Sequence, residues 1–205
     1  MVEKATENNQ IDIVPVVTKE QYRAIDHEDL LYRWEYDGTN AIRLSGASDI
    51  HAIIQARIIT KLVNFIDKYE LSCVTTTSEY YLTIETEDKT TIHHPDVTLL
   101  CSNDLTTKKY NLSDMNPILT VEVLSKSSIN MDTVVKLERY AKIPSLRFYL
   151  IVSQYDRKIS VFHKGKNSDT FDPEVIHIGN SNADIYFVPS WFTLKLDYIY
   201  NRLVD

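Results

Sequence analysis

One acidic residue lies inside an otherwise uncharged run near the middle of the chain, Leu119-Thr120-Val121-Glu122-Val123-Leu124. Alternation along a β-strand would place Glu122 on one face with Thr120, and the two valines on the other. An ionised carboxylate packed in such a strand is destabilising by several kcal/mol unless a positive group or a metal ion compensates its charge. The partner must come from elsewhere in the chain, which makes Glu122 the leading functional candidate.

A second carboxylate, Asp96, follows Pro95 at the start of another apolar run. Carboxylates on neighbouring strands can converge on a divalent cation, and oxygen ligands suit Mg²⁺ or Mn²⁺. Such an ion polarises a phosphate and lowers the pKa of its bound water, and a nearby ammonium steadies that water or the developing charge. The usual position of that lysine, two residues after the glutamate, holds Leu124. Lys136 is the natural substitute, because the helix expected there can fold back over the end of the strand.

Each of these residues also has a purely structural interpretation. Glu122 could be a core carboxylate bridged to an arginine or a tyrosine hydroxyl, and Asp96 could cap the edge of a strand. Lys136 could lie on a helix surface and pair with Asp132 one turn earlier, an interaction worth roughly 0.2–0.5 kcal/mol. The catalytic interpretation therefore depends on the carboxylates and the lysine coming together.

Soft-metal sites are disfavoured. The doublet His93-His94 lies close to Asp96, but consecutive residues of a strand point to opposite faces and cannot easily share one zinc ion. Cys73 and Cys101 have no metal-ligand spacing, and two reduced, buried thiols are favoured over a disulfide or a zinc site.

Apolar spacing, capping residues and turn signals predict the elements that must position these groups. Apolar residues recur three and four apart between Asp49 and Tyr69, which indicates a long amphipathic helix. A second helix over Met131–Ala141 should end before Pro144. The other expected elements are a short helix over Lys19–Ile25 capped by Thr18, a hairpin of 32–38 and 41–44, strands at 71–76, 78–85, 96–101 and around Glu122, a hairpin of 147–153 and 158–163, a strand near 185–188 and a closing helix near 196–203.

This order predicts an α/β fold with a mixed β-sheet flanked by helices. The 205 residues suffice for one well-cored domain, expected at 18–205 after a flexible N-terminal arm at 1–17. No run of about 18 apolar residues could span a membrane. The polar start of the chain lacks the apolar core of a signal peptide, so a cytoplasmic location is the expectation.

Charge is unevenly distributed along the chain. The net charge is −7, yet residues 126–166 carry nine Lys and Arg against three acidic residues, and the remainder carries 13 basic and 26 acidic residues. A local basic segment on an acidic body is compatible with holding phosphates at one place. A solvated helix face and hairpin would explain the same segment equally well.

The ordered series of motifs resembles a known group of enzymes. Pro95-Asp96 followed by Pro117–Ser125 looks like the signature of the PD-(D/E)XK nuclease superfamily. Further segments on both sides of these motifs make the chain similar to the Uma-two family of bacterial restriction-type endonucleases, over about residues 20–205. They are Lys136, Tyr140, Ile143–Leu146, Tyr149–Gln154, the hairpin Glu35–Gly38, the helix opened by His51, and Leu194–Arg202.

The resemblance implies a restriction-endonuclease-like core with an added N-terminal hairpin. It implies that Asp96 and Glu122 bind Mg²⁺ or Mn²⁺ and that Lys136 is a displaced catalytic lysine. Glu35 would be an auxiliary acid, as a ligand or a group that positions water, although it could also be a solvent-facing strand residue. His51 matches a recurrent family histidine, or it forms only a hydrogen bond at the start of its helix. Ser125–Ser128 departs from the family's Ser-Pro-Ser-Thr.

Three functions follow from this set of residues. The first is a Mg²⁺-dependent endonuclease that hydrolyses DNA phosphodiester bonds through a metal-activated water, with a homodimer as a further expectation. The second is a catalytically weak or inactive nuclease-fold protein that binds nucleic acid or a protein partner, which Leu124 and the acidic net charge favour. The third is an interaction protein whose acidic body and 13 tyrosines form a homo-oligomer face.

Overall fold

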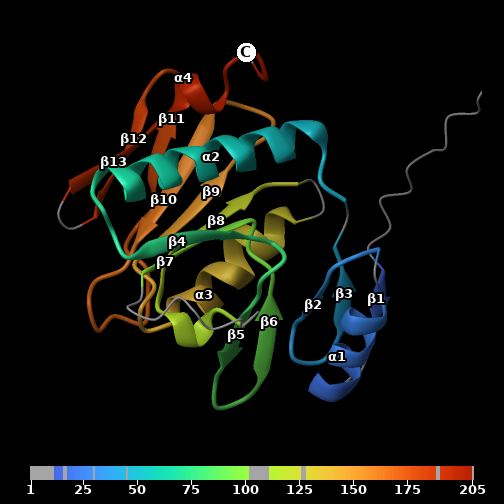
Figure 1. Ribbon diagram of the computed structural model, residues 1–205. Coiled ribbons are helices and arrows are strands. Elements are labelled where there is room, and N and C mark those ends of the chain that lie inside the picture. Colours follow the sequence, from blue (N-terminus) through green and yellow to red (C-terminus); the bar gives the residue numbers. More distant parts are fainter. Residues whose placement is uncertain are drawn as a thin grey trace, which may run out of the picture.

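The computed structural model describes residues 12–15, 18–29, 31–44, 46–101, 111–125, 128–187 and 190–204. Two β-sheets make up most of it, and Figure 1 shows how the helices are placed around them. The six-stranded sheet has the order β11-β10-β9-β8-β7-β4. β8 and β9 pair in parallel and the other neighbours pair antiparallel, which confirms the mixed sheet expected from the sequence. The strands are β4 (Cys73–Thr77), β7 (Val97–Cys101), β8 (Pro117–Val123), β9 (Phe148–Val152), β10 (Lys158–His163) and β11 (Val175–Ile178).

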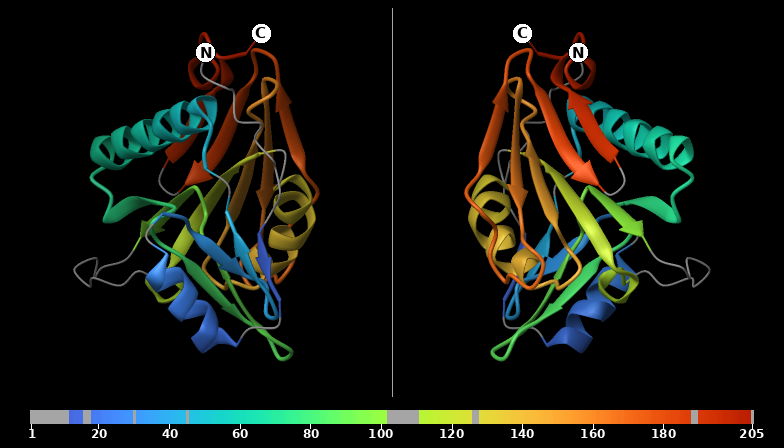
Figure 2. Two further views of the ribbon diagram at one scale, coloured as in Figure 1. Left: turned by 90° about the vertical axis from the view of Figure 1, so that its right-hand side faces the viewer. Right: turned by 90° about the vertical axis from the view of Figure 1, so that its left-hand side faces the viewer.

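Helices cover both faces of this sheet (Figure 2). On one face, α2 (Asp49–Lys68) lays Ile54, Ile58 and Leu62 on the odd-numbered residues of β8, in one core cluster. The Ser48 hydroxyl caps α2 by accepting from the His51 N–H at 3.1 Å. On the other face, α3 (Lys136–Ala141) packs Tyr140 into a second cluster. Glu122 faces α3, because its partner on β9 is Ile151, a member of that second cluster.

A five-stranded sheet with the order β1-β3-β2-β6-β5 lies beside the first. Its strands are β1 (Ile13–Val14), β2 (Trp34–Tyr36), β3 (Ala41–Arg43), β5 (Leu82–Glu85) and β6 (Thr90–His93). α1 (Lys19–Glu28) begins at the predicted cap, where Thr18 and Gln21 form a capping box. β6 leads through Pro95 and Asp96 directly into β7, so the chain passes from one sheet to the other at Asp96.

The second long helical segment differs from a simple α-helix. Met131–Val135 forms a π-helical turn that runs into α3, and the Lys136 N–H bonds the Met131 carbonyl instead of a carbonyl four residues back. Such turns inside helices occur frequently at functional sites. Tyr149 of β9 donates a hydrogen bond of 2.9 Å to the Asp132 carbonyl, which holds this turn against the sheet.

The chain end also differs from expectation. A single strand near 185–188 was expected, but β12 (Asn182–Phe187) and β13 (Ser190–Lys195) form a hairpin, whose apolar residues add to the α2 core. The closing helix α4 (Leu196–Ile199) is shorter than the predicted 196–203, and Arg202 has a φ of 59°. β6 and β11 were not predicted either. Both are four-residue strands: β6 pairs with β5 across the turn at 86–89, and β11 pairs with β10.

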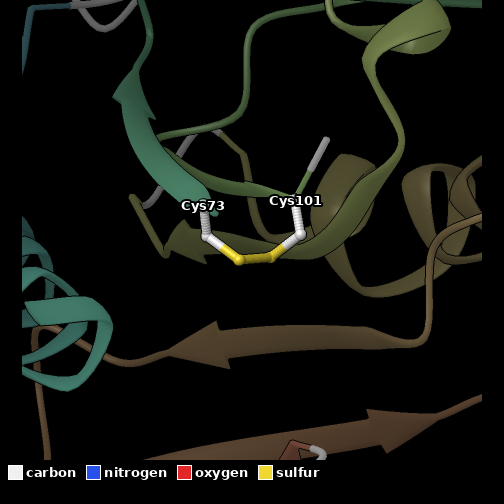
Figure 3. Close-up of a disulfide and its surroundings, with 2 residues drawn as sticks. All are labelled: Cys73 and Cys101. Carbon is white, nitrogen blue, oxygen red and sulfur yellow. A yellow bond between two sulfur atoms is a disulfide. The ribbon is translucent and has the colours of Figure 1, made fainter. Parts of the chain in front are cut away.

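The prediction of two reduced cysteines was wrong. Cys73 and Cys101 form a disulfide between β4 and β7 (Figure 3). The two residues are direct register partners, with Cα atoms 4.1 Å apart. Their 28-residue separation in sequence gives no local sign of this pairing, because the register depends on how the two strands meet.

Part of the segment expected to be an arm has structure. Ile13 and Val14 pair with Ile42 and Ala41 of β3, whereas residues 1–11 lie outside the described part of the chain. The division into an arm at 1–17 and one domain at 18–205 stays a prediction. In the described part of the chain, no helix has both the length and the apolar character needed to cross a bilayer.

Candidate active site

A buried lysine lies at the centre of the site. The Nζ atom of Lys136 is 2.9 Å from Glu35 Oε1, 3.0 Å from Glu122 Oε1 and 3.1 Å from Asp132 Oδ1. All four side chains are 5% exposed or less. Lys136 is therefore not a surface residue that pairs only with Asp132. Glu122 has the partner that its place in an apolar strand required.

Four separate elements bring these groups together. Glu122 comes from the middle of β8, and Glu35 comes from β2 in the other sheet. Asp132 lies in the π-helical turn and Lys136 opens α3. Asp132 and Lys136 are four residues apart, so both lie on the same side of the helical segment, and that side faces the sheet.

The electrostatics favour an ammonium at Lys136. Burial lowers the pKa of Lys136, but the carboxylates of Asp132, Glu122 and Glu35 outweigh burial and raise it well above its ordinary value. Burial would raise the pKa of Glu35, yet Lys136 and His93 hold it well below its usual range. Lys136 is therefore a permanent positive charge at neutral pH.

Glu122 is the least favourably placed of the acids. Burial raises its pKa well above the ordinary value, Lys136 opposes this shift, and Asp132, Asp96 and Glu35 add to it. Glu122 Oε1 also accepts a hydrogen bond of 2.8 Å from the Tyr140 hydroxyl. Removal of Lys136 would leave several negative charges without compensation in the interior.

Asp96 is tied to the residue that follows Glu122. Asp96 Oδ2 accepts from the Val123 N–H at 2.7 Å, and Oδ1 accepts from His51 Nε2 at 3.0 Å. Gln55, one turn further along α2, donates to the Asp96 carbonyl at 2.6 Å. The start of α2 thus fixes the position of Asp96, and His51 contacts its side chain directly.

The two neighbouring histidines have different partners, as strand alternation predicts. His93 Nε2 lies 3.0 Å from Arg139 Nη1, and because a guanidinium can only donate, this ring nitrogen accepts. His93 Nδ1 therefore carries the hydrogen and donates to Glu35 Oε2 at 3.0 Å. Burial lowers the pKa of His93, which agrees with a neutral ring. His94 instead contacts the Ser78 carbonyl at 2.9 Å, so the pair does not form a zinc site with Asp96.

The donor set fits a hard divalent cation in chemistry and charge. Three carboxylates, Glu35, Glu122 and Asp132, share the buried Lys136 ammonium, and Asp96 lies next to them on the Val123 N–H. Asp132 Oδ1 lies within ion-pair distance of Lys136 but accepts no hydrogen bond, and it is buried. Carboxylate oxygens are the ligands that Mg²⁺ prefers. Among the described residues no group of three His, Cys, Asp or Glu side chains is arranged to hold a metal ion. The three acids that converge, Glu35, Glu122 and Asp132, converge on the Lys136 ammonium.

Much of the basic segment at 126–166 is committed to partners within the chain. Lys136 and Arg139 belong to the site. Lys164 is buried and donates to the carbonyls of Ala141 and Ile143, at the end of α3, at 2.6 Å each. Lys142 pairs with Asp169, and Arg157 pairs with Asp197. The charge available to hold phosphates is therefore smaller than the sequence suggested.

The site contains three residues to which the sequence assigned no role in it. Asp132 appeared only as a surface partner of Lys136, and His93 only as part of a disfavoured zinc site; Arg139 had no assignment. The four-residue spacing of Asp132 and Lys136 was the available signal, but it fits an exposed pair equally well. Glu35, His51, Asp96, Glu122 and Lys136 were all singled out from the sequence, and the structure places them in one connected region.

Comparisons with known proteins bear on the family and the fold of the chain. A family model described as "Uma2: Putative restriction endonuclease" matches residues 19–189. The protein slr1290 of Synechocystis sp. (strain ATCC 27184 / PCC 6803 / Kazusa), described as uncharacterized, is 29% identical over 155 residues, which are 76% of this chain and 78% of that protein. A crystal structure described as a putative nuclease belonging to DUF820, from Anabaena variabilis ATCC 29413, matches with a TM-score of 0.62 and 13% identity, over 83% of this chain and 91% of that one. The structural match confirms the expected fold.

Proposed function

This chain belongs to the Uma2 family of restriction-endonuclease-like proteins, and from that premise we propose that it is a metal-dependent endonuclease that hydrolyses DNA phosphodiester bonds. One observation carries the proposal. The buried Lys136 ammonium lies within 3.1 Å of three carboxylates, and Asp96 is hydrogen-bonded to the residue next to Glu122. A structural core has no need of three buried acids around one lysine, because apolar side chains of similar volume are often as stable or more stable.

Asp96 and Glu122 would hold Mg²⁺ or Mn²⁺, and Asp132 Oδ1 offers a further oxygen without a hydrogen bond. When bound, the cation supplies polarisation of the phosphate and a water of lowered pKa. Lys136 is held as an ammonium, so it cannot take a proton from water. Its role is to donate hydrogen bonds to a phosphate oxygen or the attacking water and to stabilise the negative charge that develops there.

Glu35 and His51 act through other residues. Glu35 bonds both Lys136 and His93, so it sets the direction of the ammonium. His51 donates to Asp96 Oδ1 while the Val123 N–H donates to Oδ2, so His51 sets the orientation of the Asp96 carboxylate. Both are positioning residues, and their loss should weaken the site without removing a reacting group.

A second candidate function is a nuclease-fold protein that binds a partner and cuts slowly or not at all. The observation that favours it is the internal use of the basic residues at 126–166, which reduces the charge available for a DNA backbone. A protein of this kind would bind a metal ion weakly and show no metal-dependent cleavage.

The test is cleavage of supercoiled plasmid and of single-stranded DNA with Mg²⁺, Mn²⁺ or a chelator. Cleavage should require the metal, and Glu122→Gln and Asp96→Asn should each reduce it by about 10²-fold or more. Glu138→Gln, an exposed acid on α3, is the matched control and should cut at the wild-type rate. Equal rates for Glu122→Gln and wild type would refute the proposal, and absence of any metal-dependent cleavage would favour the binding function.

A further inference from the structure

β11 is an edge strand with an open row of backbone groups. It pairs with β10 on one side, and in the described part of the chain no strand pairs with its other side. The Gly179 N–H donates to the Arg157 carbonyl at 3.0 Å, so residues 157 and 179 form a hydrogen-bonded pair. Such pairs alternate along an antiparallel ladder. The N–H and C=O groups of Glu174, Ile176 and Ile178 therefore point away from β10, and of these the Ile178 C=O already accepts from the Ser181 N–H at 3.2 Å.

The side chains of β11 leave this edge unprotected. Val175 is 55% exposed, Ile176 is 50% exposed and Ile178 is 65% exposed. Natural sheets usually protect a free edge with lysine, proline, a bulge or a cover. Val175–Ile178 contains no charged residue and no proline, and its register with β10 is continuous. A free and apolar edge of this kind is suited to pairing with another strand.

We propose that β11 pairs antiparallel with β11 of a second copy of this chain, about a two-fold axis at Ile176. Ile176 then lies opposite Ile176 of the second copy, and Glu174 lies opposite Ile178. In this register the two Ile176 residues exchange hydrogen bonds, and the Ile178 N–H donates to the Glu174 carbonyl of the other copy. The Ile178 carbonyl already accepts from the Ser181 N–H at 3.2 Å, so it would accept the Glu174 N–H of the other copy with its second lone pair. Moving the second strand by one residue would place the outward-facing N–H and C=O groups opposite groups that already bond β10. Moving it by two residues would leave one outward-facing residue of each copy without a partner. The two six-stranded sheets become one continuous sheet.

Charge complementarity supports a second copy as the occupant. Lys158 is the partner of Ile178 on β10, and Glu174 lies at the opposite end of β11. The two-fold axis brings Glu174 of each copy beside Ile178 of the other, one strand away from Lys158. Among the described residues neither Glu174 nor Lys158 has an ion pair, so both remain available to the partner.

The pairing has a consequence that rests on the proposed function. A two-fold axis perpendicular to the sheet keeps both α3 faces, and with them both Lys136 clusters, on one side. β8 is the third strand in from β11, so three strand-to-strand distances separate it from β11 in each copy, and one more separates the two β11 strands. Measured along the sheet this is about 34 Å. One helical turn of B-DNA is about 34–36 Å. The dimer would thus present two sites to one face of a duplex.

The test is the mass of the full chain by light scattering after gel filtration over a range of concentrations. Wild type should run as a dimer, at twice 23.8 kDa. Ile176→Lys and Ile178→Lys should each be monomeric with unchanged circular dichroism. Val74→Lys, at an exposed position on the opposite edge strand β4, should remain dimeric. A monomeric wild type, or dimers that persist in both β11 variants, would overturn the proposal.

Hydrogen exchange of the wild type gives a second measurement if the variants fail to fold. The amides of Glu174, Ile176 and Ile178 should be protected in the dimer, whereas in a monomer they face solvent and exchange quickly. Fast exchange at all three would also overturn the pairing. Neither measurement depends on cleavage, so a protein that dimerises but does not cut DNA would refute the proposed function and leave the dimer standing.

Discussion

Replacing Lys136 by methionine tests the electrostatics of the site most directly. The change removes the ammonium from three nearly buried carboxylates and keeps a side chain of similar length. Breaking a buried ion pair by removing one partner lowers stability by about 3–5 kcal/mol. We expect a loss of that size in the free energy of unfolding at pH 8 in the presence of a chelator.

The loss should depend on pH, and its sign follows from the carboxylates. Without the ammonium, the folded-state pKa values of Glu122 and Asp132 rise further above their ordinary values, because burial already raises both. A carboxyl group whose pKa is raised by folding destabilises the protein as pH climbs from its unfolded pKa, near 4, towards its folded one. The deficit of Lys136→Met should therefore be smaller at pH 5 than at pH 8.

Urea unfolding followed by circular dichroism at the two pH values measures both effects. Lys142→Met is the matched control: Lys142 pairs with Asp169, but the two side chains are 43% and 75% exposed. An exposed pair of this kind is worth about 0–1 kcal/mol. A deficit in Lys136→Met no larger than in the control, or one that does not change with pH, would contradict the ionised cluster described here.

Three other predictions concern the groups around the site and the disulfide. Burial lowers the pKa of His93, so the free energy of unfolding of the wild type should fall as pH drops below about 6.5. Between pH 6.5 and 5 the urea midpoint of His93→Gln should fall less than that of the wild type. His51→Ala should weaken Mg²⁺ binding by about 10–100-fold, as measured by calorimetry; unchanged affinity would remove its positioning role. The Cys73–Cys101 disulfide joins residues 28 positions apart, so its reduction should lower the free energy of unfolding by about 3–4 kcal/mol. In a protein with both Cys73→Ala and Cys101→Ala, dithiothreitol should leave the free energy of unfolding unchanged.

Several features of this protein could be read from the sequence because their causes are local. Thr18 caps α1 as expected, since an N-cap needs only a side chain that accepts a hydrogen bond from an N–H three residues later. The alternation along β8 placed the valines in the α2 core and Glu122 on the opposite face. The same local pattern showed that Glu122 needs a compensating partner, and the motif series supplied the family.

The identity of that partner was decided by tertiary structure. Glu35 and Glu122 are 87 positions apart in the chain and come from different sheets, yet both bond the same ammonium. Whether Lys136 faces solvent or the core depends on how α3 lies on the sheet. Spacing along the helix is identical in the two cases.

The disulfide and the edge strand follow the same rule. Cys73 and Cys101 looked like isolated thiols until β4 and β7 paired in register. Val175–Ile178 is a strand because β10 offers it a ladder, and it is an open edge because no other described strand follows it. The sequence by itself determined the helices, the principal strands and the acids and lysine able to do chemistry. Only the tertiary structure decided which of them meet, because contacts between distant segments depend on the packing of whole sheets and helices rather than on neighbouring residues.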